Sequence, residues 1–203
     1  MTTILSITEE DFDSAVDIAR PILRSGGIII YPTDTVYGIG GDATSDDVVK
    51  KISKIKGTSP DKPLSVMVGD FGTIDYYCDT GLWEDIILKK YLPGPYTFLL
   101  KRRRPLAASK TGKLGIRLPD SMFCQLLCQK FGKPIITTSA NISGQNPPDT
   151  LQEVDKGILD AADVAIDGGQ TKYGGASVIV DLVEKKLIRT GLKEIDLVEF
   201  PER

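Results

Sequence analysis

The chain contains 203 residues, 41% of them hydrophobic and 26% charged, with a net charge of −3, which is the composition of a globular protein with a buried core. The absence of histidine excludes a histidine general base, a Ser-His-Asp triad and a histidine-ligated metal. Three cysteines, no apolar run near the roughly 18 residues of a membrane span, and no secretory signal in the first residues predict a cytoplasmic protein without membrane attachment.

The first quarter of the chain is predicted to alternate strands and helices. A strand at residues 3–7 precedes a helix over 8–25, which a Gly-Gly pair ends. The continuous apolar run at 28–31 predicts a strand that is buried on both faces. A serine cap, two first-turn acids and a closing glycine predict the next helix over 45–57.

Strands outnumber helices in the rest of the chain. The periodicity predicts helices at 82–91, 121–131 and 151–159, and strands at 63–68, 96–101, 114–118, 134–137, 163–167, 176–182 and 186–189. This irregular order predicts an α/β (α+β) fold in which helices pack against a mixed sheet, within a single domain over 1–203. Cys124 and Cys128 share a face of a predicted helix, where buried small hydrophobic residues are expected rather than a metal site.

The charges are distributed unevenly along the chain. Residues 50–117 contain 14 Lys/Arg and 6 Asp/Glu, a net charge of +8, whereas the remainder contains 11 and 22, a net charge of −11. The total of −3 argues against a nonspecific nucleic-acid coat. The positive charge of the segment 50–117 is explained either by solvated surfaces or by a face that binds an anion.

Four polar clusters border predicted strands or helices: "PTDTVYG" at 32–38, "KIKGTSPDKP" at 54–63, "TTSANISG" at 137–144 and "GGAS" at 174–177. Small hydroxyls and glycine-exposed N–H groups donate hydrogen bonds to phosphate or carboxylate oxygens without filling the space of a ligand. Any one cluster also suits a turn or helix cap. Together they predict a pocket for an anion, and the cations expected to offset its charge are Lys54, Lys56, Lys62, Lys113, Arg117 and Arg189.

Known nucleotide-binding glycine motifs are absent from the sequence. There is no Walker A motif, and Gly38-Ile39-Gly40-Gly41 lacks the full spacing of a dinucleotide-binding loop. However, five segments in order, "YPTDTVYGIGGDAT", "KGTSPDKPLSV", "LPGPYTFLL", "GIRLPD" and "TTSANISG", resemble the YrdC-type threonylcarbamoyl-AMP synthase family, including its YciO-like branch. The resemblance runs from about Ile28 to Arg189. It implies a YrdC/RibB-like fold with a twisted mixed sheet around a concave, positively charged cleft.

The resemblance also implies a nucleotidyltransferase reaction. L-threonine, bicarbonate and ATP, the last accompanied by Mg²⁺, would give threonylcarbamoyl-adenylate and pyrophosphate. Downstream tRNA-modification proteins would use this intermediate to modify the adenosine beside the anticodon. Because the nucleophiles belong to the substrates, no catalytic side chain and no dedicated metal ligand are expected. The protein would align anions and neutralise developing charge.

Site residues follow from the resemblance position by position. The threonine-binding residues it implies are Thr35, Arg117, Thr137 and Ser177. The ATP-binding residues it implies are Lys56, Thr58, Lys62, Lys113, Ser139, Asn141 and Arg189.

The sequence departs from the family pattern at four of its positions. Thr58 stands where the family's Lys-x-Arg element has its arginine, and a single Lys56 does not reproduce that two-pronged phosphate clamp. Lys62 replaces a common Asn, Met67 a common His and Lys113 a common Thr. In one interpretation, Lys62 and Lys113 restore the positive charge that the missing arginine would supply. In the other, the protein is a paralogue with an altered substrate or weak synthase activity.

A non-catalytic, YciO-like protein that binds double-stranded RNA or tRNA is the alternative function. The basic middle and "KRRRP" at 101–105 favour it. Against it, the aromatic residues needed for base stacking are sparse around that charge.

Overall fold

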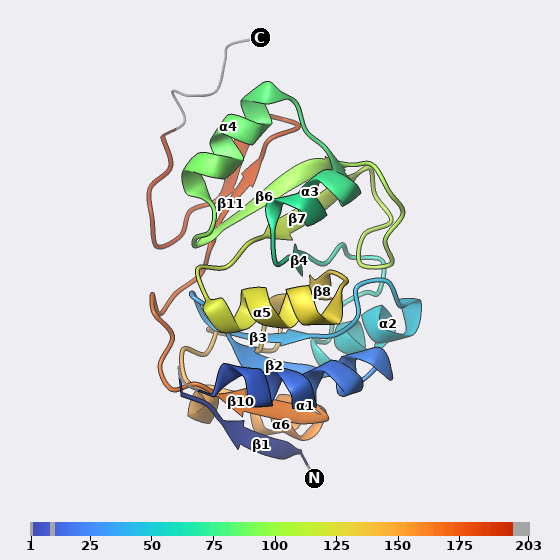
Figure 1. The fold of residues 1–203 in the computed structure, drawn as a ribbon, viewed down its shortest axis with the longest axis vertical. Helices are drawn as coiled ribbons and strands as arrows, with labels where there is room; N and C mark the ends of the chain where they lie inside the picture. Colours follow the sequence, from blue (N-terminus) through green and yellow to red (C-terminus); the bar gives the residue numbers. More distant parts are fainter. Residues whose placement is uncertain (1, 9–10, 197–203) are drawn as a thin grey trace.

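The computed structural model describes residues 2–8 and 11–196, and its strands form two mixed sheets that lie one above the other in Figure 1. The five-stranded sheet has the order β1 (Thr3–Ser6), β10 (Val164–Asp167), β2 (Ile29–Pro32), β3 (Tyr37–Gly40) and β9 (Thr138–Ser139). Its first three strands are parallel, and β2, β3 and β9 pair antiparallel. The sequence predicted the mixed topology, but the strands divide between two sheets instead of forming one.

The second sheet has seven strands. Its order is β12 (Lys186–Arg189), β11 (Val178–Asp181), β6 (Tyr96–Arg102), β7 (Lys113–Arg117), β4 (Val66–Met67) and β8 (Ile135–Ile136), with β5 (Cys78–Asp79) paired to β6. Parallel pairs join β11 to β6 and β4 to β7, while the other pairs are antiparallel. The edge of this sheet formed by β4 and β8 lies on the side that faces the first sheet (Figure 1).

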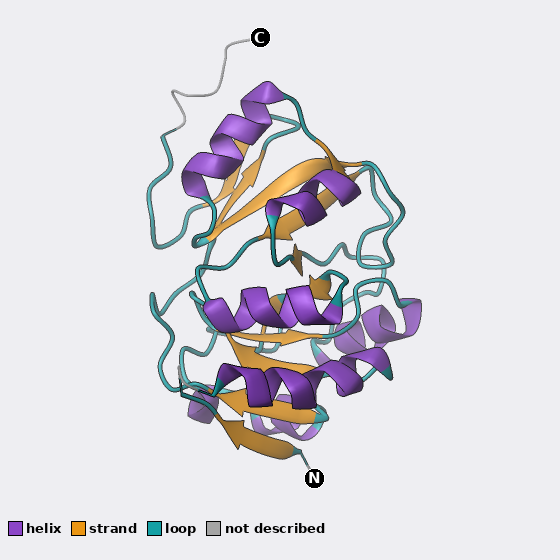
Figure 2. Cartoon of the chain, viewed as in Figure 1, coloured by secondary structure: helices purple, strands orange, loops and turns teal. Residues whose placement is uncertain are grey.

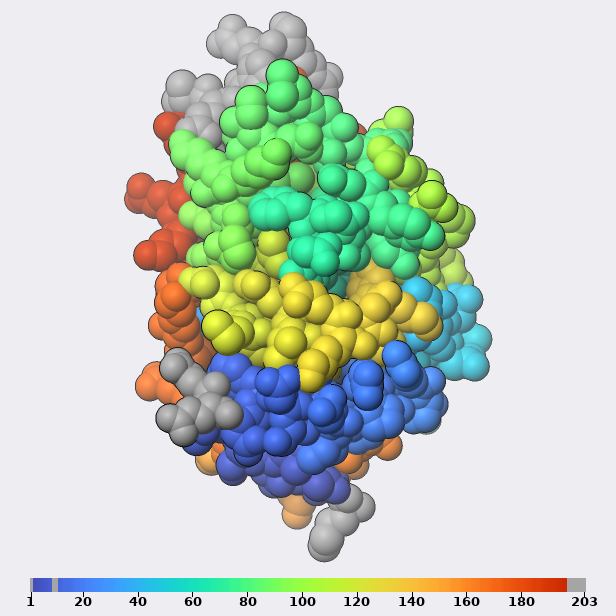
Figure 3. Space-filling model, viewed as in Figure 1, coloured from blue at the N-terminus to red at the C-terminus, as the bar shows by residue number. Residues whose placement is uncertain are grey.

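Helices pack on both sheets, as Figure 2 shows. They are α1 (Phe12–Arg24), α2 (Asp46–Ile55), α3 (Phe71–Tyr77), α4 (Leu82–Tyr91), α5 (Met122–Phe131) and α6 (Lys156–Asp160), with a 3₁₀ turn at Leu151–Glu153. α1 and α5 lie side by side, and the segment that contains α5 forms a band between the N-terminal segment and the 70–105 region in Figure 3. These two helices cover one face of β2 and β10, where their apolar side chains form one of two buried clusters.

Local sequence signals placed most helices correctly. The Ser45 side chain caps α2 by accepting a hydrogen bond from the Val48 N–H, as predicted, and Ser121, which was not predicted as a cap, does the same for α5 with the Cys124 N–H. α1 begins at Phe12, with Asp11 rather than a residue at position 8 as its N-cap. The helix predicted over 151–159 is interrupted, because the Asp155 carboxylate accepts hydrogen bonds from two N–H groups and starts α6 as a new helix.

The strand at 28–31 is buried on both faces, as its uninterrupted apolar run predicted. Ile29 and Tyr31 face α1 and α5, while Ile28 and Ile30 belong to the larger buried cluster around the second sheet. Cys124 and Cys128 are likewise buried, as predicted, and burial raises the pKa of the Cys124 thiol to about 12. None of the helices in the described residues has the length and apolar character needed to cross a membrane.

The two sheets meet where β3 ends beside β8. The Ile136 N–H donates to the Gly41 carbonyl oxygen at 2.9 Å, and the Tyr31 hydroxyl donates to the Ile136 carbonyl oxygen at 3.1 Å. A Cβ atom on Gly40 would lie 2.1 Å from that same carbonyl oxygen and about 3 Å from the Tyr31 ring. The glycines after β2 thus serve the contact between sheets, in agreement with their lack of a nucleotide-binding spacing.

Gly40→Ala is expected to destabilise the protein by about 3 kcal/mol, because its methyl group would collide with backbone and separate β3 from β8. Urea unfolding measures the change in free energy. Gly112→Ala is the matched control: a Cβ there meets nothing within 4 Å, and a change within about 1 kcal/mol is expected. Equal stability of the two variants would contradict this account of the contact.

Candidate active site between the two sheets

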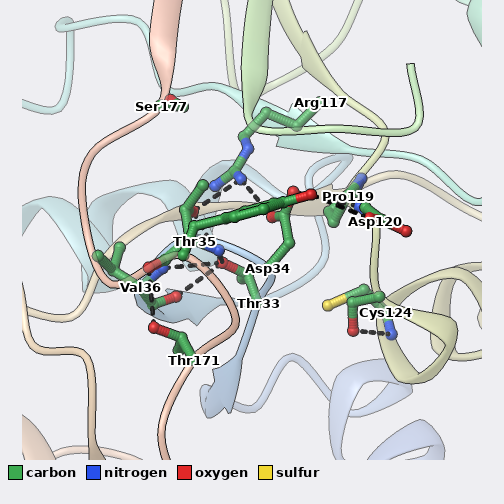
Figure 4. Close-up of polar contacts among 12 residues, drawn as sticks. Thr33, Asp34, Thr35, Val36, Arg117, Pro119, Asp120, Cys124, Thr171 and Ser177 are labelled. Carbon is green, nitrogen blue, oxygen red and sulfur yellow. Dashed lines mark hydrogen bonds and ion pairs between the residues drawn. The ribbon is translucent and has the colours of Figure 1, made fainter. Parts of the chain in front are cut away.

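A tight turn between β2 and β3 presents the first site residues. The Thr33 hydroxyl closes this turn by accepting from the Thr35 and Val36 N–H groups, at 3.1 and 3.3 Å, and by donating to the Val36 carbonyl oxygen at 2.7 Å. This is the local side-chain pairing that favours threonine in turns. The turn holds the Asp34 carboxylate and the Thr35 hydroxyl toward the second sheet, as Figure 4 shows.

Arg117, at the end of β7, reaches this turn from the other sheet. Its Nη2 donates to Asp34 Oδ1 and to Thr35 Oγ1, both at 2.8 Å. The Asp34 side chain is 0% exposed and that of Arg117 is 9% exposed, so the ion pair is screened little by water. Burial raises the pKa of Asp34, while Arg117 and the Asp120 N–H oppose the rise.

A third segment, residues 171–175, fixes the same turn from outside. The Tyr173 N–H donates to the Asp34 carbonyl oxygen at 2.9 Å, and the Gly175 N–H and Thr171 hydroxyl donate to the Thr35 carbonyl oxygen at 3.1 and 2.8 Å. Lys172 pairs with the Asp120 carboxylate at 2.6 Å, which ties this segment to the loop after β7. Asp34 and Thr35 are therefore positioned by side-chain and backbone contacts on several sides.

The turn that begins with Ser139 faces the same space. The Lys56 ammonium donates to the carbonyl oxygens of Ser139 and Asn141, at 2.5 and 2.8 Å, and so fixes the backbone between them. The Asn141 amide donates to the carbonyl oxygens of Ile142 and Gln145, at 2.9 and 2.7 Å, which folds the following loop back. Burial, together with the neighbouring Lys62, lowers the pKa of Lys56 to about 8.

Ser177 and Arg189 form the far wall. The Arg189 guanidinium donates from Nε and Nη2 to the Ser177 carbonyl oxygen, at 3.1 and 2.8 Å, and from Nη2 to the Ser177 hydroxyl at 3.1 Å. The Ser177 hydroxyl also lies 2.9 Å from the hydroxyl of Thr97 on β6. Burial and the nearby Arg117 lower the pKa of Arg189, and both guanidinium groups line the same cavity.

A single cavity of about 440 Å³, to which both sheets contribute, is lined by Thr35, Lys56, Thr97, Arg117, Ser139, Asn141, Ser177 and Arg189, whereas Asp34 is not among its lining residues. Four of its lining side chains are cations, Lys56, Lys62, Arg117 and Arg189, and among the described residues no Asp or Glu lines it. Hydroxyl groups supply most of the remaining polar lining. Such a lining suits a ligand with several anionic oxygens. The positive cleft that the resemblance implies stays a prediction, and these four cations are the residues that would create it.

Comparison with known proteins identifies the family of the chain. A family model for Sua5, yciO and yrdC proteins, described as telomere recombination, matches residues 21–191. The chain belongs to the Sua5/YciO/YrdC family. The resemblance that the sequence motifs indicated is thereby confirmed.

Individual proteins of this family are similar to the chain over most of its length. A Methanocaldococcus jannaschii protein, provisionally named threonylcarbamoyl-AMP synthase, is 36% identical over 187 residues, which is 91% of this chain and 88% of the relative. The crystal structure of Pyrococcus abyssi Sua5 complexed with L-threonine superposes with a TM-score of 0.83 at 28% identity, over 94% of this chain and 57% of that one. The chain thus spans little more than half of that longer protein.

The crystal structure of Escherichia coli YciO gives the same TM-score of 0.83 at 24% identity, over 97% of this chain and 99% of the other. At this identity the likeness concerns the fold. It confirms the α/β class with twisted mixed sheets and packed helices.

The structure brings together ten of the eleven site residues that the family resemblance implied. Those lining the cavity are Thr35, Lys56, Thr58, Lys62, Arg117, Thr137, Ser139, Asn141, Ser177 and Arg189. The exception is Lys113, at the other end of β7, whose ammonium pairs with the carboxylates of Asp181 and Glu184 at 2.7 and 3.1 Å. Its part in ATP binding stays a prediction, although its ammonium is engaged elsewhere. Met67, where family members commonly have His, is fully buried beneath α5.

Sequence reasoning missed two residues of this family site. Asp34 lies within the "PTDT" motif, but nothing in the sequence indicated that its partner is Arg117, 83 positions later. Thr97 lies in "LPGPYTFLL", where it reads as an ordinary β-branched strand residue. A threonine among aromatic and leucine residues of a buried strand was the available signal, because a buried hydroxyl requires a partner.

Proposed function

We propose that the chain is an L-threonylcarbamoyladenylate synthase, a nucleotidyltransferase that forms threonylcarbamoyl-AMP and pyrophosphate from L-threonine, bicarbonate and ATP. The names of the family relatives and the threonine complex of Pyrococcus abyssi Sua5 support this activity. The observation that supports it most directly is one cavity in which the Arg117–Thr35 pair and the Ser139 turn face the same space.

Arg117 has the free donors that an amino-acid carboxylate requires. Its Nη2 contacts Asp34 and Thr35, while among the described residues Nη1 has no protein partner; Nε also has none but is enclosed by the protein. A guanidinium that is fixed by an ion pair on one nitrogen can accept a carboxylate on another without reorienting. Threonine bound here would direct its amine toward the centre of the cavity, with Thr137 and Ser177 as further hydroxyl contacts.

The chemistry uses nucleophiles that the substrates supply. The threonine amine attacks CO₂ released from bicarbonate, and a carboxylate oxygen of the resulting N-carboxythreonine attacks the α-phosphorus of ATP. A new P–O bond forms as the bond to pyrophosphate breaks. Four cations near the reacting anions offset the charge that develops, and the hydroxyl donors align the two substrates.

Magnesium would arrive with ATP. Among the described residues no group of three or more His, Cys, Asp or Glu side chains gathers to hold a metal ion. The cavity lining offers hydroxyl and carbonyl oxygens, so the phosphates and water would supply most of the oxygen ligands that Mg²⁺ prefers. When bound, the ion would neutralise part of the triphosphate charge.

The proposal extends to the cellular setting. The chain would act as a single domain over 1–203 in the cytoplasm and pass its product to tRNA-modification proteins. Direct tRNA binding, the alternative, receives little support from the basic run after β6. There Arg103 and Lys101 pair with Asp79, at 2.6 and 3.5 Å, and Arg104 stacks on the Tyr76 ring at 4.1 Å.

Pyrophosphate release tests the proposed activity. The purified chain with ATP and Mg²⁺ is expected to release pyrophosphate only when L-threonine and bicarbonate are both present, because the adenylated species is the N-carboxylate. Reactions that lack one of the two are the controls. Tight tRNA binding without such turnover would support the RNA-binding alternative and overturn the synthase.

Substitutions on the two sides of the cavity are expected to separate the two substrates. Arg117→Ala should weaken L-threonine binding more than ATP binding, and Ser139→Ala should do the reverse. Because Arg117→Ala leaves a buried carboxylate unpaired, Thr35→Val is the cleaner variant for the threonine side; about tenfold weaker threonine binding is expected from the lost hydroxyl. Calorimetric titration with each ligand measures the effect. Equal losses for both ligands in each variant would refute the division.

Lys62 is expected to perform part of the task of the missing arginine. It lies at the exposed edge of the cavity, and among the described residues no carboxylate pairs with it. Lys62→Ala should therefore weaken ATP binding about tenfold or more, since it removes a charged phosphate contact. Lys89→Ala, an exposed lysine on α4 outside the cavity, makes the same charge change and should leave ATP binding unaltered. An equally silent Lys62→Ala would exclude this role.

A further inference from the structure

Thr97 and Ser177 form a pair of buried hydroxyls in the wall of the cavity. Their oxygen atoms lie 2.9 Å apart, and Thr97 and Ser177 are only 2% and 6% exposed. Thr97 belongs to β6 and Ser177 directly precedes β11, its parallel neighbour, so the pairing of the strands sets the distance between them. Both line the cavity, yet the family resemblance assigned a role to Ser177 alone.

Arg189 restricts how this pair can share its protons. A guanidinium only donates, so the Ser177 oxygen must accept from Arg189 Nη2, which lies 3.1 Å away. Two further bonds from Arg189 to the Ser177 carbonyl oxygen, at 3.1 and 2.8 Å, keep the guanidinium in this position. One of the two acceptor sites on the Ser177 hydroxyl is therefore already occupied.

The number of hydroxyl protons shows how many donors remain for a ligand. Two hydroxyls contain two O–H donors, and the bond between them uses one. Among the described residues neither hydroxyl has another protein acceptor, so one O–H is left for whatever occupies the cavity. The adjacent Arg189 cation polarises Ser177 and makes its hydroxyl the stronger donor to an anion. The favoured arrangement has Thr97 donating to Ser177, with the Ser177 proton directed into the cavity.

We propose that Thr97 is a positioning residue that fixes the hydroxyl proton of Ser177 for an anionic oxygen of bound L-threonine or its N-carboxylate. This role rests on the proposed synthase function and deepens it. Thr97 would act on the ligand through Ser177, and its own hydroxyl would make no bond to the ligand. Without Thr97 the Ser177 hydroxyl could rotate, and its second acceptor site would have no donor in a buried wall.

Threonine binding by isosteric variants tests the proposal. Thr97→Val retains the shape and removes the hydroxyl, and L-threonine binding measured by calorimetry is expected to weaken about tenfold, equivalent to about 1.4 kcal/mol. ATP binding should change less than twofold, and Thr97→Ser should restore threonine binding. Circular dichroism melting checks that the variants are folded, and Thr97→Ala provides a second hydroxyl deletion.

The double variant distinguishes positioning from an independent contact. If Thr97 acts through Ser177, then Thr97→Val combined with Ser177→Ala should weaken threonine binding no more than Ser177→Ala alone. Additive losses, or threonine binding by a folded Thr97→Val equal to that of the wild type, would overturn the positioning role. A wild-type chain that binds no L-threonine would instead overturn the proposed function, and this role with it.

Discussion

The buried ion pair between Arg117 and Asp34 is the interaction on which the candidate site depends. One partner comes from each sheet, and both are almost fully removed from water. Burying two charges is costly, and the cost is offset only when their geometry and remaining hydrogen bonds are satisfied. Here the carboxylate also accepts from the Asp120 N–H, and the guanidinium also donates to Thr35. Because neither charge can remain buried alone, correct packing of the two sheets and correct formation of the cavity are a single event.

The cavity is lined by neutral hydrogen-bond donors and by cations that differ in how many contacts they make with the protein. Lys56 is committed to two backbone carbonyl groups, so its charge organises the Ser139 turn as much as it offers a ligand contact. Lys62 lies at the exposed edge, where no carboxylate of the described residues pairs with it. An inner set fixed by hydrogen bonds and an exposed outer cation suit a site that holds one small anion in a defined orientation while a larger polyanion enters. Thr58, where the resemblance implies an arginine in the family, also lines the cavity and is half-buried.

Sequence patterns predicted the helices and strands whose limits depend on neighbouring residues. They failed for strands whose limits depend on pairing with other strands. The Ser45 cap and the apolar run at 28–31 depend on neighbouring residues and were predicted correctly. Two-residue strands such as β4 and β8 exist only because other strands lie beside them, so their limits could not be derived locally. The division into two sheets has the same cause.

Lys113 shows how far sequence patterns could place the residues of the candidate site. The family resemblance and its positive charge made Lys113 a candidate, and Arg117 on the same strand does line the cavity. Four residues along a strand separate two side chains by roughly 13 Å, however, so Lys113 shares a face of β7 with Arg117 but is not among the residues that line the cavity. Its position beside two carboxylates was set by the hairpin after β11, which no local pattern revealed.

The distribution of the lining residues along the chain has a consequence for biosynthesis. The wall begins with Thr35 and ends with Arg189, on the last strand of the second sheet. A polypeptide leaves the ribosome from its N-terminus, so a nascent chain has no complete cavity until nearly all of these positions have emerged. Products that terminate before β12 would therefore lack the part of the cavity wall that Arg189 forms.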